Sequence, residues 1–300
     1  MKTFKFLLSI VISLSLIGCA SAQTKKRQTA EKSKTKTAKT IDKTASDKPI
    51  DKPMNYDIKV LTEGAYSRIE KPFVFVARSN DIYAQLQNLV ENLPPVLEID
   101  FSQTAVVAAF AGTKNTGGYS VTIKNSAGRV SIDMVNPPKD AMVTQVITAP
   151  FKVALVSLEE NNSVNLELSS NWKSTMQIYR ITSGTFEYSG GFAGMRKEFG
   201  VEGIIGVLSL GDIATLVFNL DGKGAEKTRK LSEATSGLMK NSNIDLAILD
   251  AGSFSENPKP PLKVSGTVAN NKLSLVFEPL PSRIADGFQV RGKIEAVKAK

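Results

Sequence analysis

Short alternating apolar runs, closed by turn residues, constrain the fold of this 300-residue chain more than any other feature. The clearest case is VSGTVANNKLSLVFEP at 264–279, where two alternating runs flank Asn270 and Asn271. Successive side chains of a strand point to opposite faces, and asparagine tolerates the positive φ of a tight turn. The pattern therefore predicts a β-hairpin. Further strands are predicted at 176–182, 201–210, 214–220, 244–249 and 288–297.

Three segments of this C-terminal half are not plain strands. Asp221-Gly222 predicts a hairpin turn. Residues 226–240 are ambiguous and fit a return strand followed by a short helix, because Leu231, Ala234 and Leu238 have roughly helical spacing. The glycine-rich segment 190–194 has neither the P-loop lysine spacing nor the full dinucleotide glycine pattern, and is predicted to be a loop.

The N-terminal half predicts one helix among strands. A compact apolar strand at 73–78 leads to Ser79 or Asn80 as helix N-cap, and Pro94-Pro95 ends the helix. Gly117-Gly118 predicts a hairpin, and 125–128 a second turn. The remaining strands are predicted at 97–101, 105–112, 120–123, 130–134 and, with strand character around Pro150, 142–156.

These elements predict a mainly β protein with one or two helices, an α+β class built on antiparallel sheets. We expect two small sandwich- or barrel-like modules, a β-rich domain at 57–168 and a second mainly β domain of unknown type at 169–300.

The first 18 residues are typical of an export signal. Lys2 and Lys5 precede an apolar run from Phe6 to Ile17, which is too short to span a bilayer as a helix. The following LIGC at 16–19 resembles the lipobox of bacterial lipoproteins, and that resemblance implies cleavage before Cys19 and its lipidation. Several acyl chains anchor a protein stably. The alternative is an ordinary secreted protein with a cysteine near its cleavage site.

Residues 19–56 are predicted to be a disordered tether. They are rich in Lys, Thr, Ala and Asp, and lack the apolar surface that offsets chain entropy. Of the formal charge of +9, the signal carries +2 and the tether +6, which leaves +1 for 57–300. The folded region therefore offers no electrostatic case for nucleic acid. Ala20 and Ser21 contain no acidic retention signal, which favours the outer membrane or cell surface over the inner membrane.

Composition excludes most familiar catalysis. The chain has no histidine and one cysteine, so it has no Ser-His-Asp triad, no His-ligated zinc and no intrachain disulfide. Glu159-Glu160, the lysine-rich 223–230 region and SNWK at 170–173 are each interpreted as solvated surface. We predict no enzyme, no cofactor, no metal site and no catalytic residue; an enzyme of unknown type is the least favoured hypothesis.

One stretch carries a family resemblance. The string DFSQTAVVAAFAGTKNTGGYSVTI at 100–123, followed by VTQVITAPFKVALV at 143–156, resembles the PrcB C-terminal domain family, which is named for a lipoprotein subunit of a bacterial surface protease complex. The resemblance covers about residues 73–156. The matching positions are Asp100, Phe101, Gly112, Thr116, Gly117, Gly118, Tyr119, Pro150 and Phe151.

The resemblance implies a secreted accessory protein that supports an extracellular protease. We therefore predict a lipid-anchored envelope protein that binds and stabilises a protein partner, with an inhibitor-like or ligand- or glycan-binding module as the alternative. The candidate contact turn is Thr116, Gly117, Gly118 and Tyr119, which alternatively makes a tight turn with Tyr119 packed on the sheet. Asp100 is interpreted as the cap of a turn.

Overall fold

The computed structural model describes residues 57–126, 128–158, 163–190, 195–223, 230–250, 261–280 and 289–300. Residues 51–300 form one compact unit. No helix in these ranges has the length and apolar character needed to cross a membrane.

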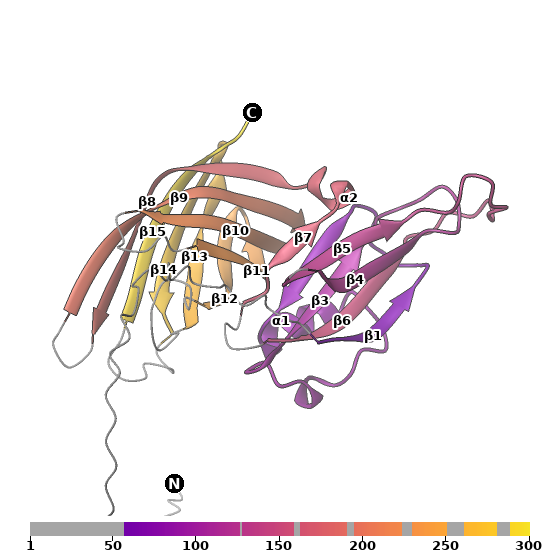
Figure 1. Cartoon of the computed structure of the whole chain (residues 1–300), viewed down its shortest axis with the longest axis horizontal. Helices are drawn as coiled ribbons and strands as arrows, with labels where there is room; N and C mark the ends of the chain where they lie inside the picture. Colours follow the sequence, from indigo (N-terminus) through magenta and orange to yellow (C-terminus); the bar gives the residue numbers. More distant parts are fainter. Residues whose placement is uncertain are drawn as a thin grey trace, which may run out of the picture. The chain divides into compact units, whose positions relative to one another are not determined.

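Two β-sheets and two short helices make up the N-terminal half (Figure 1). The four-stranded antiparallel sheet has the order β1-β6-β3-β2 and consists of Ile58–Gly64 (β1), Phe73–Ala77 (β2), Thr104–Phe110 (β3) and Phe151–Ser157 (β6). The three-stranded sheet consists of Ser120–Ser126 (β4), Arg129–Val135 (β5) and Leu166–Leu168 (β7), the last pairing parallel with β5. The helices are Asn80–Gln87 (α1) and Ser170–Lys173 (α2), with a 3₁₀ turn at Val96–Glu98.

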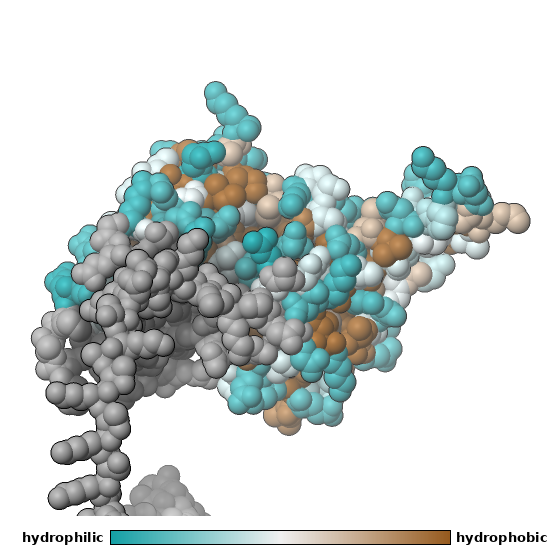
Figure 2. Space-filling view, viewed as in Figure 1, coloured by the Kyte–Doolittle hydropathy of each residue, from teal (hydrophilic) through white to brown (hydrophobic). Residues whose placement is uncertain are grey.

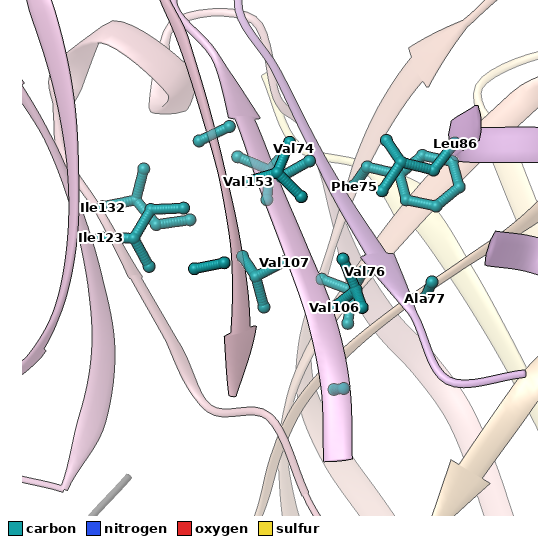
Figure 3. Packing of buried hydrophobic residues seen from close by; sticks show 14 of the residues in the cluster. Val74, Phe75, Val76, Ala77, Leu86, Val106, Val107, Ile123, Ile132 and Val153 are labelled. Carbon is teal, nitrogen blue, oxygen red and sulfur yellow. The ribbon is translucent and has the colours of Figure 1, made fainter. Parts of the chain in front are cut away.

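Strands β2 and β3 of the four-stranded sheet are buried on both faces. Every residue of β2 is buried, as a near-continuous apolar strand requires. Figure 3 shows Phe75 beside Leu86 of α1, and Ile123 and Ile132 of the β4–β5 hairpin on the other side of the sheet. One hydrophobic core thus holds both sheets and α1 together.

The C-terminal half is a closed antiparallel barrel of eight strands, in which each strand pairs with its neighbours in the sequence and β15 closes on β8. Buried aromatic side chains pack inside it, with the ring centroids of Phe186 and Phe277 4.9 Å apart. Side chains can fill a barrel of this strand number. The strands are Gln177–Gly190 (β8), Met195–Leu210 (β9), Ile213–Lys223 (β10), Lys230–Lys240 (β11), Asn243–Asp250 (β12), Pro261–Ala269 (β13), Lys272–Pro279 (β14) and Gln289–Lys298 (β15).

Strand β11 of the barrel is hydrogen-bonded to the segment that precedes β7. The pairing of β11 with β12 is limited to Leu238–Lys240. Further back along β11, the N–H of Ala234 donates to the carbonyl of Val164 (2.8 Å), and the hydroxyl of Ser232 donates to Oδ1 of Asn165 (3.0 Å). The segment before β7 therefore supplies hydrogen-bond partners that β12 does not.

Hydroxyl groups of the barrel cover the edge strand β2. The N–H of Val76 donates to Oγ of Ser236 (2.7 Å), and Oγ1 of Thr215 donates to the carbonyl of Val74 (2.6 Å). The two hydroxyls lie 2.6 Å apart, on the paired strands β10 and β11. Unpaired edges are aggregation-prone, so this arrangement satisfies polar groups that would otherwise be exposed or orphaned.

A buried ion pair reinforces the same junction. Arg78, the residue after β2, donates from Nη1 to Oε1 of Glu233 on β11, and both side chains are buried. Glu233 is in register with Phe218, a member of the barrel core, and cross-strand partners share a face of the sheet. The Arg78 side chain therefore reaches a carboxylate on the inner face of the barrel wall.

Several sequence predictions are confirmed. The fold is mainly β, with antiparallel sheets and an eight-stranded barrel. Asn270 and Asn271 form the tip between β13 and β14 with φ of 52° and 62°. Oγ of Ser79 accepts the N–H of Ile82 at the start of α1 (3.4 Å). The division into domains at 168/169 stays a prediction.

The following local predictions are wrong in whole or in part. The strand expected at 97–101 is instead the 3₁₀ turn, closed by the bond from the N–H of Glu98 to the carbonyl of Pro95 (3.0 Å). Asp221-Gly222 does not turn the chain, because both residues pair with β9 inside β10. Residues 230–240 are strand throughout, and the apparent helical spacing reflects two buried faces: Leu231 packs in the barrel core and Ala234 against the other core.

The loop prediction for 190–194 largely falls outside the described residues, as do Glu159-Glu160 and 224–229. SNWK is solvated surface only in part: Ser170 and Lys173 are exposed, but Trp172 is not. Trp172 is fully buried and donates from Nε1 to the carbonyl of Phe110 (2.9 Å).

We predict that Arg78→Met lowers the free energy of unfolding by about 3–5 kcal/mol, because it leaves the buried carboxylate of Glu233 without its guanidinium. Adding Glu233→Leu should restore more than half of that loss, since the uncompensated charge is then gone. Guanidinium chloride denaturation of the full chain measures both.

The exposed pair of Arg68 and Glu91, 3.3 Å apart, provides the control. Arg68→Met should change stability by less than about 1 kcal/mol. Equal effects of Arg68→Met and Arg78→Met would contradict the role assigned to the buried pair.

Candidate protein-contact site

The segment carrying Thr116, Gly117, Gly118 and Tyr119 crosses between two sheets. It connects β3 of the four-stranded sheet to β4 of the three-stranded sheet, so the predicted hairpin at Gly117-Gly118 is wrong. β3 instead pairs with β2 and β6, and β4 pairs with β5. The glycine pair marks a tight approach to another loop, which a single sequence does not distinguish from a hairpin.

That other loop connects β5 to β6. The strand expected over 142–156 begins only at Phe151. A short antiparallel bridge closes the base of the loop: the N–H of Lys114 donates to the carbonyl of Thr148 (2.7 Å), and the N–H of Thr148 donates back to Lys114 (2.9 Å). We call residues 136–147 the arm. It extends beyond the labelled strands at the right of Figure 1.

The predicted contact turn braces this arm. Oγ1 of Thr148 donates to the carbonyl of Thr116 (2.8 Å), and the N–H of the buried Gly117 donates to the carbonyl of Thr144 (2.9 Å). Gly118 has φ +83°, and a Cβ there would lie 2.9 Å from Cβ of Pro137. Only glycine combines this φ with this approach at low cost.

Tyr119 lies half-buried beside a lysine that the sequence did not single out. Nζ of Lys114 is 5.9 Å from the centroid of the Tyr119 ring, within the range of a cation–π contact, and donates to Oδ1 of Asn171 (3.1 Å). Partial burial lowers the pKa of Lys114 below its ordinary value. The contact turn is thus tied to α2 as well as to the arm.

The arm and its root expose apolar side chains. Met142 is 98% exposed and Ile147 is 67% exposed, and Val135 and Val146 are nearly half exposed. Figure 2 shows tan, apolar surface next to teal, hydrophilic surface on the projecting end of the molecule. The sequence analysis missed Met142, Val146 and Ile147 because it assigned 142–156 to a strand. They are exposed because residues 136–147 form a projecting loop instead of a strand within a sheet.

Asp100 caps a turn, as the sequence indicates. Its Oδ1 accepts the N–H (2.9 Å) and the hydroxyl (2.6 Å) of Ser102. The hydroxyl bond first, and the backbone bond second, lower the pKa of Asp100 below its ordinary value. These bonds hold the residue in a structural role.

Cys19 lies outside the described residues, so the structure says nothing of it. Within the described part of the chain, no group of three or more His, Cys, Asp or Glu side chains is placed to hold a metal ion.

The geometry defines a β-sheet module with a braced, apolar-tipped arm. Residues 105–157 match the family model described as PrcB C-terminal, which confirms the resemblance over this segment. The match runs from β3 through β6 and includes the contact turn and the whole arm. The comparisons with curated proteins and with solved structures give no match.

We predict that Gly118→Ala destabilises the brace and lowers the free energy of unfolding by about 1–3 kcal/mol, because alanine is strained at φ +83° and its Cβ crowds Pro137 and Val143. Amide hydrogen exchange of Gly117, whose N–H bonds Thr144, should accelerate with it.

Gly211→Ala is the matched control. Gly211 also has a positive φ, +55°, but no atom lies within 4 Å of its ideal Cβ. Gly211→Ala should lower the free energy of unfolding only by the cost of placing alanine at a positive φ, and should leave amide exchange at Gly117 unchanged. If Gly118→Ala behaved like Gly211→Ala in both measurements, the brace would be refuted.

We predict that Ser102→Ala raises the pKa of Asp100 toward its ordinary value. The substitution removes the hydroxyl bond, which lowers this pKa more than the backbone bond does. A carboxyl with a lowered pKa stabilises the fold above its unfolded pKa, and that contribution disappears as the pH falls through the lowered pKa. NMR titration of the Asp100 carboxyl measures the shift. Ser102→Thr keeps a hydroxyl and should keep the low pKa; an unchanged pKa in Ser102→Ala would contradict the assignment.

Proposed function

We propose that this protein is a lipid-anchored accessory subunit of the bacterial cell envelope that binds and stabilises a partner protein, a surface protease. The observation that carries the proposal is the match of residues 105–157 to the PrcB C-terminal model. The matched segment contains the central strands β3 and β6 and everything that builds the arm.

The form of the matched segment supports a binding role. Two of its polar side chains bond within the fold: Lys114 donates to Asn171, and Thr148 donates to the carbonyl of Thr116. Its exposed large apolar side chains include Met142 and Ile147 of the arm. Exposed apolar groups on a braced loop are suited to protein contact.

The anchor is proposed from the sequence around Cys19. Cleavage before this residue and its lipidation would hold the protein at the outer membrane or cell surface by several acyl chains, beyond the marginal attachment that one chain gives. Metabolic labelling with a clickable fatty acid tests this. We expect label on the full chain and none on Cys19→Ser, which should move from the membrane fraction to the soluble fraction. A labelled Cys19→Ser protein would contradict the proposal.

Deletion of the protein distinguishes an accessory subunit from an inhibitor. If the protein stabilises its partner, deletion lowers both the amount and the activity of a surface protease, and re-expression of the full chain restores both. If it is an inhibitor, protease activity rises at unchanged abundance. Quantitative proteomics of surface fractions, together with a casein-cleavage assay, measures the two quantities. Unchanged abundance and activity would contradict the proposed function.

A further inference from the structure

We infer that the arm, rather than the glycine turn that braces it, is the surface that enters the partner, and that it fits an uncharged apolar groove of that protein. This inference rests on the proposed function, because it requires that the protein has a protein partner. It assigns the contact to Met142 and Ile147, with Val135 and Val146 beside them.

The glycine turn is built to support the arm. Gly117 is buried, and its N–H is used by Thr144. Gly118 faces Pro137 and Val143, and the carbonyl of Thr116 is used by Thr148. The groups of the turn that could bind another chain are therefore largely committed within this one.

The arm is a preordered convex element. Both of its ends are fixed, by the strand β5 at Val135 and by the bridge between Lys114 and Thr148, and its middle is held by the bond to Thr144. A loop already held in one conformation loses less entropy on binding than a mobile loop. A convex apolar loop requires a concave apolar surface on its partner.

The charge of the arm favours a protein groove over a lipid surface. Within the arm, Lys139 and Asp140 are adjacent and of opposite sign, and the run from Ala141 to Phe151 contains no charged residue. Loops and helices that bind anionic membranes carry an excess of Lys or Arg, together with Trp or Phe. The exposed large apolar side chains of the arm, Met142, Val146 and Ile147, are aliphatic or methionine rather than aromatic, and methionine adapts readily to irregular apolar pockets.

Site-specific photocrosslinking in the full chain, expressed in its own cells, tests this inference. A photoreactive amino acid is placed at Met142 or at Ile147, and at Leu97 as the control. Leu97 is matched in exposure, at 96%, but lies on the 3₁₀ turn. We expect crosslinks to one protein from Met142 and Ile147, at least about tenfold above those from Leu97, with the crosslinked peptides of the partner lining an uncharged apolar groove.

A lysine-reactive crosslinker on the same cells reports whether any partner is bound. The double variant Met142→Ser with Ile147→Ser should lower the recovered partner by about tenfold, and Leu97→Ser should leave it unchanged.

The outcomes separate the inference from the proposed function. A partner recovered with the lysine-reactive reagent, but not from Met142 or Ile147, would overturn the inference and leave the proposed function standing. Crosslinks from the arm to lipid, to a second copy of this chain, or to a charged surface of the partner would also overturn it. Recovery of no partner by either reagent would overturn both.

Discussion

The hydrogen bonds between β2 and the hydroxyls of Thr215 and Ser236 are the interaction on which the rest of the structure depends. β2 is the last strand of its sheet, and its outer edge would otherwise present unpaired backbone groups. Each hydrogen bond contributes only about 1 kcal/mol net, but a buried group left without a partner costs about 1–3 kcal/mol. The hydroxyl pair therefore satisfies the outer edge of β2 where the barrel covers it, and the buried Arg78–Glu233 pair lies at the same junction.

The contact between the barrel and β2 also supports the contact turn and the arm, through strands β3 and β6. β2 pairs with β3, and β3 pairs with β6, so the two strands that enter and leave the crossing loops lie inside one core. The glycine turn leaves β3, and the arm returns into β6. The arm itself runs from β5 to β6, and both of these strands contribute buried side chains to this core, so the loop is carried by a rigid scaffold.

Sequence reasoning is strongest where one local pattern determines the geometry. Asn270-Asn271 between alternating runs, and Ser79 before α1, are both read correctly because turn and cap chemistry is local. It fails where a segment packs against a part of the chain that is distant in sequence. Leu231 and Ala234 look helical in spacing because opposite faces of β11 are buried against different cores, and Gly117-Gly118 looks like a hairpin because the loop it braces is distant in sequence. The exposure of Met142 depends on the same distant packing.

Hydrogen exchange of the Val76 amide tests the central claim most directly. This N–H bonds Oγ of Ser236 across the junction. If the barrel covers the edge of β2, the Val76 amide exchanges only on global unfolding, with a protection equal to that of the slowest amides of β3, and Ser236→Ala accelerates it. Exchange of Val76 in the unsubstituted protein at the rate of the amides on the outer edge of β1 would contradict the account, because it would show that the edge is open in solution.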